Sequence, residues 1–202
     1  DKCMVLNEKY EFLINGLIED EFGMLEEFFP RELLLNLRSN AEQYYQLGLM
    51  APAGIGRKFS YEKNAKVRGD LIRWIDNNSD DQYEKAFLES VHDFISYLNQ
   101  SCYTGINDFE FHYAFYDEGS FYRRHKDQFN NDFGRKFSLV SYLNEDWKSA
   151  DGGQLVVYTQ QSSKKIEPRL GTTVFFRSDV TEHEVLLSHA PRFSIAGWLK
   201  KV

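Results

Sequence analysis

Apolar residues in the first half of the chain recur at the three- and four-residue spacing of amphipathic helices. This pattern predicts helices over residues 7–18, 30–48 and 80–100. The second begins with a proline, which a helix tolerates in its first turn, and it ends at a glycine. Residues 21–29, between the first two helices, are predicted as a strand. We expect the helices to pack on a sheet.

Beyond residue 108 the apolar residues occur in short runs, separated by Gly, Asp, Asn, Ser and Pro. These runs predict seven strands, over residues 109–116, 121–126, 136–143, 154–158, 172–176, 182–187 and 192–199. Many short strands at this spacing favour a sandwich or a jelly roll, and no fixed-length internal repeat competes with that reading. The helices and strands together predict an α+β protein.

The length of 202 residues suits one domain, so we expect a single domain over residues 1–202. Within it, residues 1–105 should be mainly helical support, and residues 106–202 should form the β-rich core. Aromatic residues make up 16 % of the chain, which also favours strands. Residues 49–67 contain proline and glycine with little periodicity, and they predict a long loop of the kind that is often functional.

Charge and cysteine content narrow the class of function. The net charge of −7 argues against nucleic acid as the main partner, because phosphate binding requires clustered Lys and Arg. The two cysteines lie far apart without a CxxC pair, so we expect neither a disulfide framework nor a zinc knuckle, and we expect a cytoplasmic protein. No apolar run approaches the ~18 residues of a membrane span, so no membrane partner is expected.

Candidate metal chemistry lies in residues 121–129. In a strand, side chains two apart share a face, so His125 and Asp127 should project together. His183 lies downstream in another stretch with strand character. Two imidazoles and one carboxylate form the ligand set of non-haem iron(II) oxygenases. A His-x-Asp pair is a weak signal by itself, because five histidines among many acidic residues produce such pairs by chance.

Arg192 strengthens the metal hypothesis. It follows His183 by nine residues, across the turn formed by residues 188–191. In a hairpin this arrangement would set Arg192 four strand positions from the level of His183, about 13 Å away. A five-carbon diacid and an arginine side chain could bridge that gap, since a guanidinium group matches a carboxylate with two parallel hydrogen bonds. The alternative is a surface ion pair, which is the usual state of a strand arginine.

With these residues in place, the chain resembles the iron(II)/2-oxoglutarate dioxygenases and, more narrowly, the prolyl 4-hydroxylase family that modifies protein substrates. The resemblance covers about residues 68–198. Besides the residues already named, the motifs that carry it are Arg68-Gly69-Asp70, Trp74, Tyr116, Ser141-Tyr142-Leu143-Asn144, Trp147, Gly152-Gly153-Gln154-Leu155, Phe175-Phe176 and Trp198.

The resemblance implies a fold and a site. It implies that the core is a double-stranded β-helix, with the N-terminal helices packed on one sheet, and that residues 49–67 form a finger over the substrate. It implies a metal set of His125, Asp127 and His183, with Arg192 as the fourth catalytic residue. The residues that it assigns to cosubstrate binding are Arg192 and Tyr142 on the distal carboxylate, Tyr116 nearer the metal, and Val140, Leu155 and Trp198 in the pocket wall.

A further implication concerns a pair of charged residues. The resemblance implies an ion pair between Asp70 and Arg135, which would tie the base of the finger to the neighbour of the metal strand. For Tyr116, Tyr142, Val140, Leu155 and Trp198 the alternative is ordinary core packing.

The implied activity is Fe(II)- and 2-oxoglutarate-dependent hydroxylation of a prolyl residue in a protein, of the peptidyl-proline 4-dioxygenase type. Dioxygen is the oxidant, succinate and carbon dioxide are products, and ascorbate is a candidate reductant. Some bacterial relatives act on a translation elongation factor and animal ones on a transcription factor, so the expected partner is one of these or another cytosolic protein containing proline.

Four other readings stay open. An oxygenase of a small molecule or a free amino acid would have the same metal site. Nucleic-acid demethylases share it too, but they have a second arginine where this chain has Trp198. A non-catalytic metal-binding jelly-roll protein and a zinc hydrolase leave Arg192 without a purpose. Among the other histidines, His92 and His189 are expected to be plain helix and turn residues, and His112 is the one that could replace His183 as ligand.

Overall fold

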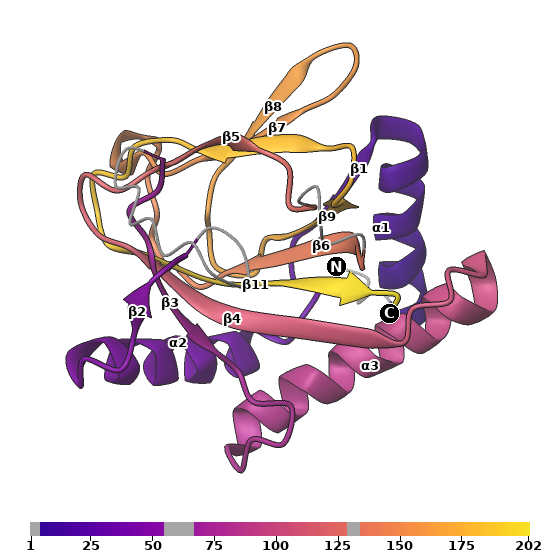
Figure 1. Cartoon of the computed structure of the whole chain (residues 1–202), viewed down its shortest axis with the longest axis horizontal. Helices are drawn as coiled ribbons and strands as arrows, with labels where there is room; N and C mark the ends of the chain where they lie inside the picture. The colour runs from indigo at the N-terminus through magenta and orange to yellow at the C-terminus, as the bar shows by residue number, and fades with distance from the viewer. Residues whose placement is uncertain (1–4, 55–66, 129–133) are drawn as a thin grey trace.

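The computed structural model describes residues 5–54, 67–128 and 134–202 (Figure 1). Its helices are α1 (Leu6–Asp20), α2 (Arg31–Gln46) and α3 (Gln82–Cys102). One sheet contains β1 (Phe22–Leu25), β2 (Ala51–Pro52), β3 (Leu71–Trp74), β4 (Asp108–Tyr116), β6 (Arg135–Tyr142), β9 (Thr173–Arg177) and β11 (Arg192–Lys200). The other contains β5 (Tyr122–His125), β7 (Leu155–Tyr158), β8 (Ser163–Ile166) and β10 (Glu182–Val185).

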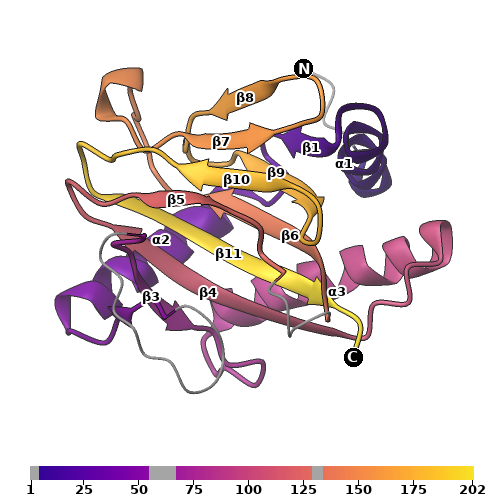
Figure 2. The same cartoon turned by 45° about the horizontal axis from the view of Figure 1, so that its top comes forward.

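The two sheets lie face to face, and every strand pair within them is antiparallel. The seven-stranded sheet has the order β1-β9-β6-β11-β4-β3-β2, and the four-stranded sheet has the order β5-β10-β7-β8. Figure 2 shows the smaller sheet over one face of the larger sheet, with α2 and α3 on the opposite face. This arrangement is a double-stranded β-helix with helices on one sheet, so the predicted fold class is confirmed.

The periodicity located most elements and missed a few. The three predicted helices and the seven strands predicted beyond residue 108 are all present, with shifted ends. The strand predicted over residues 21–29 is only β1, and β2, β3 and β8 were not predicted. The periodicity did not predict β8 because three of its four residues are exposed at the edge of the smaller sheet, so it has no apolar alternation.

α3 shows how the helical layer is fixed to the larger sheet. Its first turn is capped by the Asp81 carboxylate, which accepts hydrogen bonds from the backbone amides of Tyr83 and Glu84. Its apolar face is fully buried at Phe94, whose ring lies edge-on to that of Phe175 in β9, with 5.3 Å between the ring centroids. The helix therefore covers the outer face of the sheet.

β4 and its neighbours serve two apolar clusters at once, because successive side chains of a strand point to opposite faces. Phe111, Tyr113 and Phe115 belong to the cluster beneath the helices. His112 and Tyr116, on the other face of the same strand, line a cavity between the two sheets. β4 is buried on both faces over most of its length, although its sequence includes Glu110 and His112.

The first half of the chain contributes strands as well as helices. β1 lies at one edge of the larger sheet, and β2 and β3 lie at the other edge, so the expected division into a helical half and a β-rich half is too simple. The single-domain assignment itself stays a prediction. Of the finger loop expected over residues 49–67, residues 51–52 form β2 and residues 55–66 lie outside the described residues.

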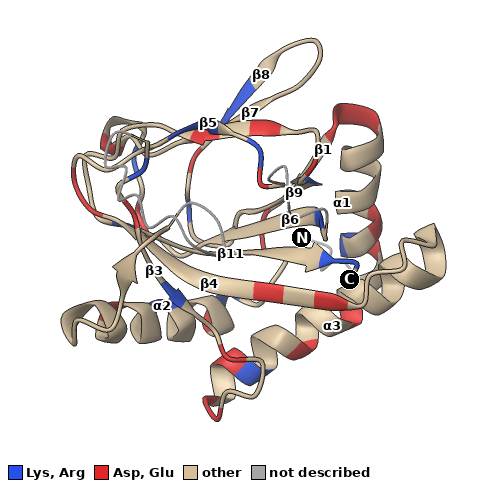
Figure 3. Ribbon diagram, viewed as in Figure 1, with Lys and Arg blue, Asp and Glu red and all other residues tan. Residues whose placement is uncertain are grey.

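Charged side chains mark the exposed edge of the smaller sheet. Figure 3 shows basic residues on β8 and acidic residues along α1. Lys164 and Lys165 are exposed on β8, and lysine on an edge strand hinders unwanted pairing with another sheet.

Each helix within the described ranges is too short or too polar to cross a membrane. The thiol of Cys102, at the end of α3, is free and exposed.

The contact between α1 and β1 should be sensitive to one added methyl group. A Cβ atom at Gly23 would lie 2.2 Å from the carbonyl oxygen of Leu13, which is backbone and cannot rotate away. We expect Gly23→Ala to lower the free energy of unfolding by about 1–3 kcal/mol, the usual effect of overpacking. Urea denaturation measures this loss, with Gly54→Ala as control, since a Cβ there meets nothing within 4 Å. Equal stability of the two variants would contradict the close approach.

Candidate active site

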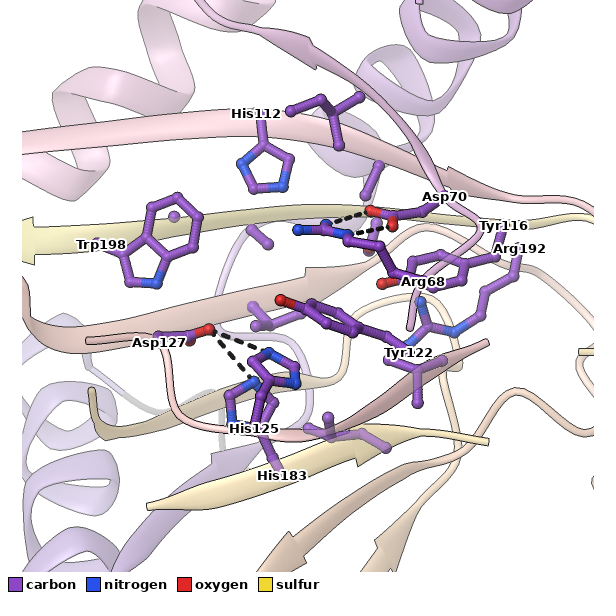
Figure 4. Close-up of a pocket in the computed structure, with 18 of the residues that line it drawn as sticks. Arg68, Asp70, His112, Tyr116, Tyr122, His125, Asp127, His183, Arg192 and Trp198 are labelled. Atoms are coloured by element: carbon purple, nitrogen blue, oxygen red, sulfur yellow. Dashed lines mark hydrogen bonds and ion pairs between the residues drawn. The ribbon is translucent and has the colours of Figure 1, made fainter. Parts of the chain in front are cut away.

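A cavity of about 420 Å³ lies between the two sheets. All of the residues that the sequence assigned to the site line it, namely Tyr116, His125, Asp127, Val140, Tyr142, Leu155, His183, Arg192 and Trp198. They come from β4, β5, β6, β7, β10 and β11 and from the residues that follow β5. Figure 4 shows Arg192 and Trp198 at opposite sides of the cavity, with the two histidines and Asp127 below them.

His125, Asp127 and His183 form the group of potential metal ligands that the described residues contain, with one ligand atom of each within 4.8 Å of the others. The pairing of β5 with β10 sets His125 directly opposite His183. Asp127 Oδ1 lies 3.4 Å from the Nε2 atom of each imidazole. Two imidazoles and one carboxylate converging from one side fit an iron(II) ion, and they leave its other positions open.

Asp127 reaches this point by a route that strand alternation does not explain. β5 ends at His125, so the expectation that both residues share a strand face is only approximate. The Ser138 hydroxyl donates a 2.6 Å hydrogen bond to Asp127 Oδ2, and the Ser178 hydroxyl lies 2.8 Å from that of Ser138. Arg135 donates to the Asp127 carbonyl oxygen at 3.1 Å. The carboxylate is therefore held with Oδ1 toward the histidines.

The imidazoles are also oriented by the backbone. His125 Nδ1 lies 2.7 Å from the carbonyl oxygen of Arg123, and His183 Nδ1 lies 3.5 Å from that of Thr181. A proton on Nδ1 leaves the lone pair of Nε2 toward the cluster, which is the tautomer that a metal requires. The Tyr122 ring stacks on that of His125 with 3.5 Å between centroids and limits its rotation.

The protonation states suit metal binding as well. Burial alone would raise the pKa of the Asp127 carboxyl, but the His183 and His125 imidazoles outweigh it and hold that pKa well below its ordinary value. Burial lowers the pKa of His125, against the opposing effect of Asp127. The carboxylate thus stays anionic and the His125 imidazole neutral, as metal ligands must be.

The opposite part of the cavity is built around Arg192, which is 2 % exposed. Its Nε atom donates to the Gly153 carbonyl oxygen at 2.8 Å, and its guanidinium carbon lies 4.8 and 5.1 Å from the ring centroids of Tyr116 and Tyr142. In the described part of the chain no carboxylate pairs with Arg192, and the buried Tyr142 hydroxyl has no hydrogen-bond partner. Burial raises the pKa of Tyr142 to about 12, so this hydroxyl keeps its proton and can donate it.

These unpaired donors fit the distal carboxylate of 2-oxoglutarate. A buried cation without an anionic partner and a buried hydroxyl without an acceptor are both costly, and one bound carboxylate would satisfy both. The keto-acid end of the same molecule would then point toward the histidine cluster. The residues present therefore fit both the metal and the cosubstrate.

The hairpin expected between His183 and Arg192 is wrong. β10 pairs with β5 and β7 in the smaller sheet, whereas β11 pairs with β4 and β6 in the larger one. The turn at residues 188–191 therefore crosses from one sheet to the other, and a distance counted along a hairpin does not apply. Both side chains nevertheless face the cavity, because each sheet turns one face toward it.

The expected ion pair between Asp70 and Arg135 is also wrong. Arg68 binds Asp70 with two hydrogen bonds of 2.7 and 2.6 Å, and it lies over the Tyr122 ring. Arg135 instead binds Glu110 at 2.9 Å and lies 3.5 Å from the Trp198 ring centroid. Arg68 and Arg135 thus each have a carboxylate partner in the fold.

Sequence reasoning missed the place of His112 in the cavity wall. This residue is not in the metal cluster, but its imidazole is 5 % exposed in the cavity wall. Burial and the positive charges of Arg68 and Arg135, against the carboxylates of Asp70 and Asp127, lower its pKa to about 4. The sequence did contain a signal for it, because His112 and Tyr116 are an even number of residues apart in one strand and so share a face. His92 and His189 are exposed, as expected.

Comparison with known proteins indicates the same class of enzyme as the ligand cluster, the iron(II)/2-oxoglutarate oxygenases. The 2OG-Fe(II) oxygenase superfamily profile matches residues 111–200. The sequence is 28 % identical to Egl nine homolog 1 of Homo sapiens over 208 residues, which covers 93 % of this chain and 46 % of that protein. The chain thus spans about half of the length of that relative.

Two solved structures are similar over nearly their whole length. A Pseudomonas putida prolyl-4-hydroxylase has a TM-score of 0.86 and 32 % identity, with 96 % of this chain and 99 % of that chain covered. A Trichoplax adhaerens prolyl hydroxylase, in complex with a hypoxia inducible factor oxygen degradation domain peptide fragment, has a TM-score of 0.86 and 27 % identity. Coverage there is 99 % of this chain and 94 % of the other.

Removing the hydroxyl that holds Asp127 should weaken metal binding. We expect Ser138→Ala to raise the dissociation constant of Mn(II) about 10- to 100-fold, the usual effect of losing a hydrogen bond to a metal ligand. Ser141→Ala is the matched control, because that hydroxyl is equally buried but bonds Thr173. Titration calorimetry decides the matter, and equal affinity in the two variants would show that Ser138 does not position the carboxylate.

Acid should destabilise the fold partly through His112. Since its pKa is about 4 in the folded protein and the ordinary value is 6.5, the unfolded chain binds more protons between these values, and stability falls as the pH drops through that range. At pH 5 this loss is roughly 2 kcal/mol relative to neutral pH. Urea denaturation at pH 5 and at neutral pH measures the loss of stability in each protein. In His112→Met this loss should be smaller than in the wild type by about 2 kcal/mol. An identical loss in the two proteins would contradict the shifted pKa.

Proposed function

The chain belongs to the prolyl hydroxylases of the 2OG-Fe(II) oxygenase superfamily, and from this premise we propose that it hydroxylates a prolyl residue in a protein. Dioxygen supplies one oxygen atom to the prolyl carbon and the other to 2-oxoglutarate, which leaves as succinate and carbon dioxide. The similarity to a prolyl-4-hydroxylase supports C4 of the ring as the position that is oxidised. We place the activity in the cytoplasm, as the low cysteine content predicts.

Iron binding is assigned to His125, Asp127 and His183. The activation of dioxygen and the removal of a hydrogen atom from the substrate are the chemistry that iron supplies when it is bound. The protein presents neutral imidazole nitrogens and an anionic oxygen from one side. Ser138 occupies the second carboxylate oxygen, which reserves Oδ1 of Asp127 for the metal. Tyr122 covers His125 and excludes water from that side of the cluster.

Cosubstrate binding is assigned to the Arg192 side of the cavity. Arg192 and the Tyr142 hydroxyl would hold the distal carboxylate, and the Tyr116 ring would cover the guanidinium from the side. Val140 and Leu155 would supply apolar contacts to the methylene groups of the diacid. The observation that carries the proposal furthest is that, among the described residues, the buried Arg192 has no carboxylate partner and the buried Tyr142 hydroxyl has no hydrogen-bond partner, in the same cavity as the histidine cluster.

The substrate is assigned to the remaining side of the cavity, near Trp198. There Trp74 is 44 % exposed, so this side opens toward solvent, where a protein segment can enter. The Trichoplax relative was solved with a peptide fragment, which supports a polypeptide substrate. Indole rings are suitable surfaces for the apolar ring of proline.

Mass spectrometry tests the proposed reaction directly. Candidate cytosolic proteins would be incubated with the enzyme, Fe(II), 2-oxoglutarate, ascorbate and air, and one proline should gain an oxygen atom, about 16 Da. Asp127→Ala should produce no gain. Succinate release without a gain on any protein, but stimulated by a small molecule or free proline, would overturn the proposal in favour of a small-molecule oxygenase.

Arg192 should control cosubstrate affinity in a manner that lysine cannot replace. Since an ammonium group cannot make two parallel bonds to a carboxylate, Arg192→Lys should raise the KM for 2-oxoglutarate about 10- to 100-fold. Arg177→Lys is the matched control, because Arg177 pairs with Asp179 on the surface. Initial rates of succinate release measure both variants. An unchanged KM in Arg192→Lys would place the distal carboxylate elsewhere.

A further inference from the structure

His112 belongs to a cluster of three rings on the cavity face of the larger sheet, in which the centroids of Trp74 and Trp198 also lie only 6.1 Å apart. Its centroid lies 5.0 Å from that of Trp74 on β3 and 5.4 Å from that of Trp198 on β11. The strand registers produce this cluster, because Trp74 and Ala196 are the direct partners of His112 across neighbouring strands and Trp198 lies two residues beyond Ala196 on the same strand face. Figure 4 shows the imidazole projecting from its strand into the cavity between Trp198 and Arg68.

Neither ring nitrogen of His112 has a hydrogen bond to a described part of the chain, and Nδ1 is fully buried without a partner. Burying an unpaired polar atom costs stability, and an apolar side chain of the same size would pack against the two indole rings without that cost. His112 is thus a poor choice for packing alone. A polar group on a ligand that enters the cavity would explain it.

The charge state and tautomer of His112 follow from its surroundings. With a pKa of about 4, the imidazole is neutral at physiological pH, so it has one donor and one acceptor. Buried N–H groups without partners are rarer in proteins than unpaired acceptors. The favoured tautomer therefore has its lone pair on the buried Nδ1 and its proton on Nε2, which faces the cavity and can donate.

The position of His112 identifies which ligand it meets. Arg192, with Tyr142 beside it, would hold the cosubstrate on the side of the cavity opposite Trp198, and the histidine cluster lies between the two sides. His112 lies on the Trp198 side, beside the partly exposed Trp74. Arg68 and Arg135, the nearby cationic donors, are already bound to Asp70 and Glu110. His112 therefore supplies a neutral donor on the side of the cavity that is assigned to the substrate.

We propose that His112 is a substrate-binding residue, which donates a hydrogen bond from Nε2 to a main-chain carbonyl oxygen next to the target proline. The inference rests on the proposed function and names the part of the peptide that is recognised. A prolyl nitrogen in a peptide has no hydrogen, so the carbonyl of the preceding residue and that of the proline itself are the nearest main-chain groups. Both are acceptors, and a neutral donor satisfies either without burying another charge.

The probe is the peptide acetyl-Ala-Ala-Pro-Ala-Ala-amide, whose only special feature is its proline. Binding would be measured by calorimetry on protein loaded with Mn(II) and 2-oxoglutarate. His112→Met fills a similar volume but removes the donor, and it should raise the dissociation constant of the peptide about five- to tenfold. His112→Gln keeps an N–H donor and should restore most of the affinity. His92→Met is the matched control on the exposed face of α3, and it should bind as the wild type does.

Affinities for Mn(II) and 2-oxoglutarate separate a substrate contact from a structural role. The proposal requires both to stay within twofold of wild type in His112→Met, an allowance of about 0.4 kcal/mol. Weakening of all three ligands together, or unchanged peptide affinity, would overturn it. So would failure of the wild-type protein to bind the peptide. None of these results bears on the oxygen gain on a protein proline, which decides the proposed function separately with the wild-type enzyme.

Discussion

The antiparallel pairing of β5 with β10 is the interaction on which the rest of the site depends, because it fixes two imidazoles opposite one another. These strands form half of the smaller sheet, and the larger sheet faces them across the cavity. Asp127 joins the histidines with its carboxylate bound by Ser138 and its carbonyl oxygen bound by Arg135, both on the larger sheet. The ligand cluster is therefore a product of both sheets, and its geometry depends on how they are spaced.

Of the three arginines that line the cavity, Arg192 is the one without a carboxylate partner among the described residues. Arg68 and Arg135 each have a carboxylate partner, which lowers the cost of burying them. Arg192 has a carbonyl oxygen and two aromatic rings instead, so its guanidinium can still accept an anion. Among the described residues, the cavity thus separates a side that attracts a dicarboxylate from a side lined by indole rings and a neutral imidazole. Two different ligands can occupy it together.

Sequence patterns located the individual elements and ligands better than their partners. His125, Asp127 and Arg192 could be singled out because short motifs are local signals, although the strand expected to hold Asp127 ends at His125. The hairpin before Arg192 could not be judged correctly, since nothing in a turn shows whether the next strand stays in the same sheet. The Asp70 partner was missed for a related reason: Arg68, two residues away, competes with every distant arginine. The bond of Ser138 to Asp127 and the contacts of His112 with two indole rings could not be predicted, because they follow only from the assembled sheets.

The double use of β4 joins the two halves of the chain into one mechanical unit. Its odd-numbered side chains are anchored in the helical layer, where the Tyr113 hydroxyl donates to Glu84 of α3, while the even-numbered ones from His112 to Tyr116 line the cavity. A shift of α3 along the sheet would therefore be transmitted through the strand to Tyr116 and His112. The β-rich core cannot be treated as a separable catalytic module, and a change far outside the cavity can alter the fit of both ligands.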